Sequence, residues 1–397
     1  MRVCFNEGMR SFPTIRVNRK GAGRVQSGHL WIFSSDIIDR GEAQSGDAVR
    51  VVDPGGRPLG VAHYSSTSQI SLRFLSGRIE PIDRDFLQRR ITAALEYRGR
   101  VVSESDAYRL VHAEGDLLPG LIVDRYGDWL VVQLLTQGMD RIAAEITGVL
   151  NATLQPKGIL ARNDVSVRAK ENLPLETRVL AGEIPDEIDI RMNGLSWRAD
   201  LVHGQKTGIF LDQRENYVAA RRYARGRGLD CFTATGGFAM HLASVCDSVE
   251  AVDSSASALE VAKGNAAANG VANISFQRAD VLELLPSLIA ARRAYDIVIL
   301  DPPAFTKSRS AIEGAARGYK EVNLRALRLL NRGGILVTCS CSHHMTEAHL
   351  LELIASAALD CGKQLRVVER RTQSQDHPIL LTVPETHYLK CLILEVL

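Results

Sequence analysis

The sequence predicts a mixed α/β protein whose C-terminal half is a parallel sheet flanked by helices. From about Trp197 onward, apolar β-like runs alternate with helical patterns, which is typical of a parallel α/β sheet. Residues 12–78 instead contain short β-like runs separated by Gly, Pro and Ser turns, which indicates a separate β-rich domain. The length of 397 residues exceeds one ordinary core, so more than one domain is expected.

Composition narrows the class of protein further. Hydrophobic residues make up 45% and charged residues 24% of the chain, which are globular values, and no apolar run approaches the roughly 20 residues that a membrane span needs. The first residues lack the apolar core of a secretory signal, so we expect a cytoplasmic protein without a membrane partner. Seven cysteines without a CxxC pair argue against a disulfide framework and against a zinc site, so no metal is predicted.

The N-terminal part is predicted to be a small basic β domain over residues 1–80. Its VDPGGRPLG stretch indicates a hairpin, and it contains eleven Arg or Lys against seven Asp or Glu, a net charge of +4. Such a charge suits a nucleic-acid contact, with Arg16 and Lys20 as predicted phosphate ligands. A solvated basic face without a partner is an equal alternative on charge alone.

The next part, residues 81–195, is predicted to be a linker helix followed by a small α+β domain. Apolar residues recur at helical spacing over 82–98, and the YGDWLVVQ stretch carries a hairpin turn. Residues 196–397 then form the α/β domain, in which a long helix is predicted over 319–334.

The α/β domain is organised around the LDCFTATGGFAMHL stretch at 229–242. It is predicted to be a strand, a tight turn and a helix. Gly236 and Gly237 carry no side chain and accept unusual backbone angles, so a bulky cofactor can approach the main chain closely there. An ordinary structural turn is the alternative for a glycine pair at such a place.

Acidic residues are predicted at the ends of the first three strands of this domain. Asp230 follows the first strand, Asp253 the second and Asp280 the third. An acid in the position of Asp253 can accept hydrogen bonds from both ribose hydroxyls, although a helix N-cap is an alternative role. The residues at these three ends are expected to form a crevice for a nucleoside. Because neither GxxxxGK[ST] nor GxGxxG occurs, S-adenosylmethionine fits better than a nucleotide.

The DPPAF loop after the fourth strand is predicted to hold a planar base. Two prolines, Pro302 and Pro303, stiffen the loop, Asp301 projects a carboxylate at the strand end, and Phe305 offers a flat surface. Methyltransferases that act on exocyclic amines use a similar loop, so this motif alone does not identify the target atom.

The VTCSCSHH stretch points to carbon 5 of a cytosine. A cysteine thiolate can add to carbon 6 of a pyrimidine, which turns carbon 5 into a nucleophile. Cys339 and Cys341 stand two apart and are expected to face the same crevice if the strand stays regular. A buried structural cysteine is the alternative for either residue.

These motifs resemble the RlmI-like family of large-subunit ribosomal RNA cytosine-5 methyltransferases. The resemblance covers essentially the whole chain, through GHLWIFSSDI, LPGLIVDRYGDWLVVQ, GQKTGIFLDQREN, DCFTATGGFA, DPPAF and SCSHHM. It implies an N-terminal PUA domain, a central EEHEE-type domain and a Rossmann-like class I methyltransferase domain. It also implies that the cysteine of SCS, Cys341, is the nucleophile. The loop reads PPAF where other RNA cytosine-5 methyltransferases carry PCS, which speaks against a two-cysteine product-release scheme.

The resemblance adds residues before the sheet to the expected cofactor site, namely Phe210 and Gln213 of the GQKTGIFLDQREN stretch. The full set of expected cofactor-binding residues is Phe210, Gln213, Asp230, Phe232, Thr235, Gly236, Gly237, Phe238, Asp253, Ser254, Asp280, Val281 and Asp301. The expected catalytic residues are Cys341 and Asp301, and the expected substrate-binding residues are Pro302, Pro303, Phe305, Arg16 and Lys20.

The function expected from the sequence is methylation of cytosine carbon 5 in large-subunit ribosomal RNA. One alternative is a methyltransferase of similar fold that acts on a guanine, for which the DPPAF loop suffices. Another is an RNA-binding PUA protein without catalysis. A trapped complex with 5-fluorocytidine RNA distinguishes the first alternative, and a test of S-adenosylmethionine binding distinguishes the second. The sequence leaves open whether the chain forms a homodimer.

Overall fold

The computed structural model describes residues 12–204, 208–303, 312–342 and 344–397. The chain divides into two compact units. The first consists of the described residues within 1–188, 200–208 and 376–386, and the second of those within 189–199, 209–375 and 387–397. No helix in the described ranges is both long enough and apolar enough to span a membrane.

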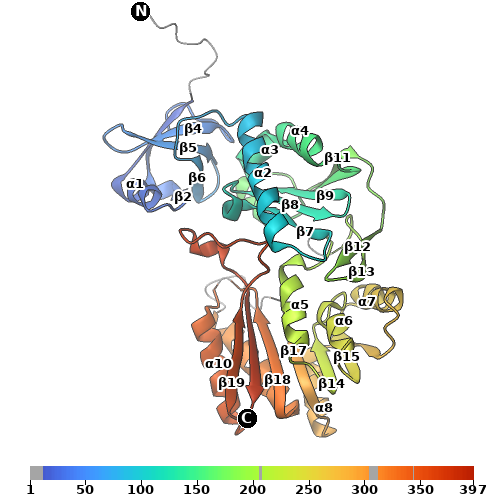
Figure 1. The fold of residues 1–397 in the computed structure, drawn as a ribbon. Helices are drawn as coiled ribbons and strands as arrows, with labels where there is room; N and C mark the ends of the chain where they lie inside the picture. The colour runs from blue at the N-terminus through green and yellow to red at the C-terminus, as the bar shows by residue number, and fades with distance from the viewer. Residues whose placement is uncertain (1–11, 205–207, 304–311, 343) are drawn as a thin grey trace, which may run out of the picture. The chain divides into compact units, whose positions relative to one another are not determined.

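The first unit begins with a β domain (Figure 1). Among the described residues its sheet has six strands in the order β2-β6-β5-β4-β1-β3. The elements are β1 Thr14–Val17, α1 Arg19–Gln26, β2 Trp31–Phe33, β3 Ile37–Asp39, β4 Ala48–Val52, β5 Pro58–Tyr64 and β6 Ile70–Ser76. Strands β4 and β5 pair in antiparallel fashion, which confirms the predicted hairpin. Alternate residues such as Ile15, Val17 and Val49 are fully buried and form its core.

A second sheet of the first unit follows α2 Arg84–Val101, the helix predicted over 82–98. Asp83 caps α2 by accepting a hydrogen bond from the Phe86 N–H at 3.0 Å. The described strands are ordered β11-β10-β9-β8-β7. The elements are β7 Ala107–His112, β8 Leu121–Tyr126, β9 Trp129–Leu134, α3 Gln137–Arg141, α4 Ala143–Leu154, β10 Gly158–Arg162 and β11 Thr177–Gly182. The division of the chain into three domains, with boundaries after residues 80 and 195, stays a prediction.

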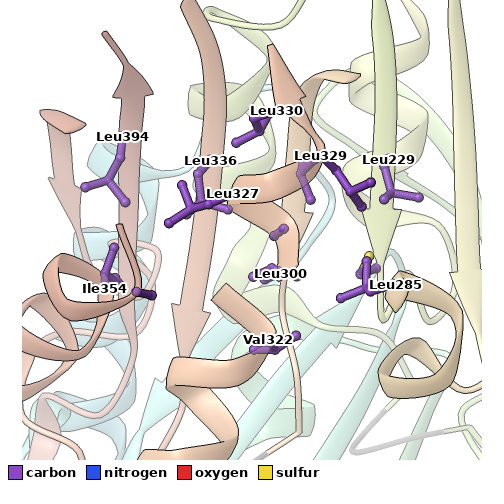
Figure 2. Close-up of a cluster of buried hydrophobic side chains, with 14 of the residues drawn as sticks. Leu229, Leu285, Leu300, Val322, Leu327, Leu329, Leu330, Leu336, Ile354 and Leu394 are labelled. Carbon is purple, nitrogen blue, oxygen red and sulfur yellow. The ribbon is translucent and has the colours of Figure 1, made fainter. Parts of the chain in front are cut away.

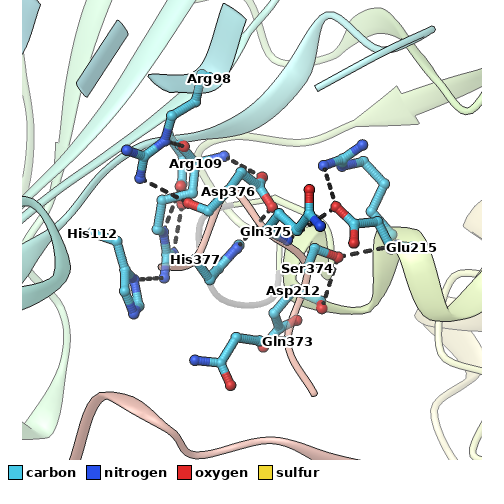
Figure 3. Close-up of polar contacts among 12 residues, drawn as sticks. Arg98, Arg109, His112, Asp212, Glu215, Gln373, Ser374, Gln375, Asp376 and His377 are labelled. Carbon is cyan, nitrogen blue, oxygen red and sulfur yellow. Dashed lines mark hydrogen bonds and ion pairs between the residues drawn. The ribbon is translucent and has the colours of Figure 1, made fainter. Parts of the chain in front are cut away.

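A late segment, Asp376–Thr386, also belongs to the first unit. Arg98 is almost fully buried and forms a bidentate ion pair with Asp116, at 2.5 and 2.7 Å. Its guanidinium also donates to the Asp376 carbonyl oxygen at 2.8 Å, and the Arg109 N–H donates to the Asp376 carboxylate at 2.9 Å (Figure 3). Because each buried charge has a partner, this cluster can hold the segment at a tolerable desolvation cost.

The second unit contains the predicted α/β domain. Its described sheet has seven strands in the order β16-β15-β14-β17-β18-β20-β19. The elements are β12 Ile188–Met192, β13 Leu195–Ala199, α5 Arg214–Arg221, β14 Arg227–Cys231, α6 Gly237–Ala243, β15 Ser248–Asp253, α7 Ala256–Ala268, β16 Ile274–Arg278, α8 Val281–Ala290, β17 Tyr295–Leu300, α9 Ile312–Leu329, β18 Leu330–Ser340, α10 Glu347–Asp360, β19 Leu365–Arg371 and β20 Lys390–Val396. Strands β14 to β18 pair in parallel, whereas β20 is antiparallel to β18 and β19.

One face of this sheet is covered by α8, α9 and α10 (Figure 2). Leu229, Leu300 and Leu336 come from three neighbouring strands, and Leu285 and Ile354 come from the covering helices. Burial of each such side chain contributes about 1.5–3 kcal/mol, so this cluster fixes the strands against the helices. The α/β fold class predicted from the sequence is confirmed.

Candidate active site

The candidate site lies where the strand order reverses. Strand β14 pairs with β15 on one side and β17 on the other, because the chain runs outward to β16 before it returns. Cys231, at the end of β14, is in register with Val252 and Leu300. The following carboxylates therefore come from the same edge of the sheet. Open α/β sheets bind ligands outside this edge, at this reversal point.

The turn after β14 has a strained backbone. Phe232 and Ala234 adopt left-handed angles, with φ of 65° and 49°, and Gly236 has φ of 91°. A non-glycine residue in this region costs of order 1–3 kcal/mol, so the surroundings must hold the turn in place. A Cβ atom on Gly237 would lie 2.3 Å from the Tyr217 ring, which leaves space only for glycine. Both glycines of the predicted turn are thus required by its geometry.

The buried Asp230 side chain holds this turn in place through hydrogen bonds. Its Oδ2 atom accepts hydrogen bonds from the Thr233 hydroxyl at 2.6 Å and from the Ala239 N–H at 2.9 Å. Its Oδ1 atom is buried and has no hydrogen-bond partner among the described residues. Burial raises the pKa of Asp230 to about 7. A buried carboxylate oxygen left without a donor fits a cationic group such as the ammonium of S-adenosylmethionine.

Asp253 lies at the end of β15, as predicted. Its two oxygens accept hydrogen bonds from the Ala234 and Ser255 N–H groups, both at 2.9 Å. Ser255, and not Asp253, caps α7. Each carboxylate oxygen has a second lone pair, so Asp253 retains the capacity to accept ribose hydroxyls. This arrangement fits the role predicted for it.

Asp280 has a different setting from the one expected. Strand β16 ends at Arg278, so Asp280 lies two residues beyond the strand, and its side chain is exposed. It caps α8 by accepting a hydrogen bond from the Leu282 N–H at 2.7 Å. The next residue, Val281, is buried in the hydrophobic core.

The other residues expected around the cofactor differ in burial. Phe210, Phe232 and Thr235 are half-buried, and Ser254 is exposed. Phe238 is buried and its ring contacts Tyr217 edge to face, with centroids 4.8 Å apart. The Phe238 side chain therefore packs inside the domain.

Asp301 directly follows β17 and is half-buried. Its Oδ2 atom accepts a hydrogen bond from the Gln213 side chain at 3.0 Å. Pro302 is buried and Pro303 is exposed, while Phe305 lies outside the described residues. Gln213, which we expected at the cofactor, thus contacts the acid of the DPPAF loop.

A chain of amides sets the orientation of Gln213. Arg371 donates from Nε to the Asn216 side-chain oxygen at 2.9 Å, and Asn216 donates from Nδ2 to the Gln213 side-chain oxygen at 2.7 Å. Because Arg371 can only donate, each amide in the chain has a defined direction, and Gln213 must donate to Asp301. Sequence reasoning did not identify Asn216 or Arg371, which stand 155 residues apart.

The helix that carries these amides is anchored at its start (Figure 3). The Ser374 hydroxyl donates to the Asp212 carbonyl oxygen at 3.0 Å and accepts from the Glu215 N–H, also at 3.0 Å. Residues after β19 therefore hold the beginning of α5, from which Gln213 reaches Asp301.

The two cysteines of VTCSCS have unequal surroundings. Cys339 is fully buried and stands opposite Cys391 on β20. Burial raises the pKa of the Cys339 thiol well above its ordinary value, and the neighbouring Cys391 thiol raises it further. Cys341 lies one residue beyond the end of β18 and is half-buried. The expectation that both thiols face one crevice depended on a regular strand, but β18 ends between them, at Ser340.

Two further residues surround this strand end, and sequence reasoning missed both. Lys390 is buried at the start of β20 and donates from Nζ to the Ser342 carbonyl oxygen at 2.6 Å. Tyr319 of α9 is also buried, and its hydroxyl accepts a hydrogen bond from the Ser340 hydroxyl at 2.8 Å. Burial raises the pKa of Tyr319 to about 12, so its hydroxyl is neutral at physiological pH.

The strand order and the glycine turn define a doubly wound α/β protein with a ligand site at the reversal point of its sheet. A model of the S-adenosylmethionine-dependent methyltransferase family matches residues 109–394, and a PUA-like domain model matches residues 15–77. The chain therefore belongs to the S-adenosylmethionine-dependent methyltransferase family, and its cofactor is S-adenosylmethionine. This result confirms the PUA-like domain and the methyltransferase domain that the resemblance implied.

Relatives match the chain over most of its length. The ribosomal RNA large subunit methyltransferase I of Tolumonas auensis is 42% identical over 375 residues, which cover 92% of this chain and 94% of that protein. The protein of the same name from Klebsiella pneumoniae is 39% identical and covers 96% of this chain and 97% of its own length. The structure of SMU.776 in complex with SAH matches 96% of this chain and 100% of that chain, with a TM-score of 0.83 at 20% identity. This likeness shows a shared fold.

Among the described residues, no group of three or more His, Cys, Asp or Glu side chains is arranged to hold a metal ion.

Proposed function

We propose that this protein methylates carbon 5 of a cytosine in large-subunit ribosomal RNA, with Cys341 as the nucleophile. The observation that carries the proposal is the position of Cys341, a half-buried thiol just past β18, while the Asp301 carboxylate follows the neighbouring strand β17. The names of the relatives from Tolumonas auensis and Klebsiella pneumoniae support ribosomal RNA as the substrate class.

Each group has a definite task in this reaction. The Cys341 thiolate forms a bond from Sγ to carbon 6 of the cytosine, and the electron pair of the 5,6 double bond becomes available at carbon 5. S-adenosylmethionine supplies the methyl group that carbon 5 accepts. A base removes the carbon-5 proton, and loss of the thiolate from carbon 6 restores the double bond. Asp301 accepts a hydrogen bond from the exocyclic amine and keeps the ring oriented.

The PUA-like domain supplies a candidate RNA contact. Arg16 on β1 and Lys20 on α1 are both exposed, whereas the nearby Arg24 already pairs with Asp36 and stacks on Phe33. We infer that Arg16 and Lys20 contact phosphates. Replacing both with alanine should weaken RNA binding several-fold and reduce the salt dependence by about one to two counterions, because each phosphate contact releases about one ion. A salt titration of RNA binding measures this, and an unchanged slope would contradict it.

The target atom is tested by mass spectrometry of nucleosides. Large-subunit ribosomal RNA from cells without this activity is incubated with the protein and S-adenosylmethionine and then digested. The proposal predicts 5-methylcytidine as the new nucleoside. A methylguanosine in its place would overturn the proposal and favour a guanine-directed enzyme. RNA binding without any new methylated nucleoside would indicate a protein that is not catalytic on this RNA.

A further inference from the structure

Lys390 lies opposite the end of β18, and the candidate nucleophile Cys341 directly follows that strand. It stands opposite Ser340 in the β18–β20 pairing, and its side chain is only 4% exposed. Its ammonium donates to the Ser342 carbonyl oxygen at 2.6 Å and to the Tyr388 carbonyl oxygen at 2.9 Å. Ser340, which stands opposite Lys390, and Ser342, which accepts its hydrogen bond, are the residues directly before and after Cys341 in the chain.

The charges around this ammonium are few. Burial lowers the pKa of Lys390 to about 8, and the negative charges of Cys341 and Glu347 act in the opposite direction. Glu347 also pairs with Arg370, so part of its charge is already balanced. Tyr319, which accepts the hydrogen bond of the Ser340 hydroxyl, is neutral at physiological pH. Asp301, which follows β17, accepts a hydrogen bond from Gln213.

Electrostatic coupling between two groups is reciprocal. If a thiolate at Cys341 stabilises the protonated form of Lys390, the ammonium of Lys390 stabilises that thiolate by the same amount. A nearby cation is a general means of making a cysteine nucleophilic at neutral pH. An amine with a pKa of about 8 remains mostly protonated at pH 7, so the cation is present under working conditions.

We propose that Lys390 is a positioning residue that keeps Cys341 in the thiolate form and holds the turn after β18 in place. Its catalytic consequence rests on the function proposed above, whereas its effect on the thiol does not. Lys390 remains an ammonium throughout. The thiol proton leaves to solvent before the cytosine is attacked, so Lys390 neither accepts nor delivers a proton.

The same unit contains a matched control. Lys363 donates to the Leu330 carbonyl oxygen at 2.6 Å and to the Leu327 carbonyl oxygen, and burial also lowers its pKa. The cysteine near this lysine is Cys361. Lys363 is half-buried rather than buried, but it shares the pair of carbonyl contacts and the direction of the pKa shift with Lys390, and the thiol beside it is not the candidate nucleophile. A merely structural lysine should behave like Lys363.

The test measures alkylation of individual cysteines by iodoacetamide between pH 6 and 10. Peptide mass spectrometry separates Cys341 from the other cysteines. The variants are Lys390→Gln, which keeps a donor but removes the charge, Lys390→Arg, which keeps the charge, and Lys363→Gln. Calorimetry with S-adenosylhomocysteine and a thermal melt show which variants remain folded.

The inference predicts that Lys390→Gln moves the midpoint of Cys341 alkylation upward by about one pH unit, because a neighbouring charge shifts a pKa by roughly that amount or more. The thiolate fraction at pH 7 then falls about tenfold. Lys390→Arg should leave the midpoint near that of the wild type, even if a bulkier side chain lowers stability. Lys363→Gln should leave it unchanged.

An unchanged Cys341 midpoint in a folded Lys390→Gln protein would overturn the inference, and so would equal shifts in Lys390→Gln and Lys363→Gln. If Lys390→Gln does not fold, an upward shift in Lys390→Arg overturns it. No RNA is needed, so these results are independent of the target atom. A shifted midpoint in a protein that makes no 5-methylcytidine would refute the proposed function and leave the thiol effect intact.

Discussion

The two halves of the candidate site are built differently. On the cofactor side, at the ends of β14 and β15, Asp230 and Asp253 accept hydrogen bonds mainly from backbone N–H groups of the adjoining turns and of helix α6. We call the ends of β17 and β18 the acceptor side, because the methyl-accepting base is expected there. On this side, side chains from distant parts of the chain contact Asp301 and the strand end beside Cys341. Gln213 precedes Asp301 by 88 residues, and Lys390 follows Ser342 by 48.

We infer from this difference that the cofactor side serves binding and that the acceptor side serves the chemistry. A strained turn that is held by carboxylates of the adjoining strands keeps its shape without residues from distant parts of the chain, which suits a cofactor that must bind in a constant pose. Reactive groups need controlled charge, and side chains brought from afar can tune a thiol or a carboxylate without changing the turn. Changes on the acceptor side should therefore affect the reaction, and changes on the cofactor side should affect cofactor affinity.

The largest expected effect concerns Cys341. Cys341→Ala should lower methyl transfer by about 10³-fold or more, because the covalent route is lost, while S-adenosylmethionine binding stays near the wild-type value. Single-turnover assays and calorimetry measure the two quantities. Cys361→Ala, at another half-buried cysteine, is the control and should retain activity. Substantial transfer by Cys341→Ala would remove the thiol from the mechanism.

The next effect concerns Asp253. Asp253→Ala should weaken S-adenosylmethionine binding by roughly 10–100-fold, because hydrogen bonds to a charged acceptor are lost and the Ala234 N–H loses its partner. Asp280→Asn is the comparison, because an exposed N-cap tolerates this exchange. Calorimetry on both variants is the measurement. An equal loss in Asp280→Asn would show that Asp280 also binds the cofactor.

A smaller effect concerns pH. Asp230 has a pKa raised to about 7 by burial, so the folded protein without cofactor holds its proton below pH 7. If Asp230 binds a cofactor cation, this proton must leave first. Affinity should then fall up to about tenfold for each pH unit below 7 and level off above it. Asp230→Asn should remove this slope. Calorimetry from pH 5.5 to 8.5 checks it, and a wild-type affinity independent of pH would contradict the role.

Spacing along the sequence placed the glycine turn and Asp253 at strand ends, but it did not identify the residues that contact Gln213 or the strand end beside Cys341, and locality explains this difference. The glycine turn and Asp253 lie within one unit of strand, helix and following strand, where spacing alone places each residue. The contacts of Asn216, Arg371 and Lys390 depend on β19 and β20 returning to the sheet, which no local pattern reveals. The fold class was predictable for the same reason, since alternating strands and helices are a local pattern.

The segment 319–334 shows the limit of local reasoning. Helix α9 ends at Leu329, and the NRGG residues predicted as its last turn already belong to β18. Tyr295 is in register with Leu330 but Ile297 with Ile335, so these residues form a bulge in the strand. Gly333 has a φ of 71°, which an α-helix cannot contain, so the helical pattern does not continue there. Helix α10, with Thr346 as its cap, carries an apolar repeat that could have been identified from sequence.

The most direct test of the account uses RNA in which the target cytosine is replaced by 5-fluorocytidine. Fluorine at carbon 5 prevents proton loss, so the thioether at carbon 6 persists after methyl transfer. The account predicts a denaturant-stable protein–RNA complex that requires S-adenosylmethionine, with the linked nucleotide mapped to Cys341. Its absence with a methylated natural substrate, or a link to Cys339, would contradict the assignment of Cys341 as the nucleophile.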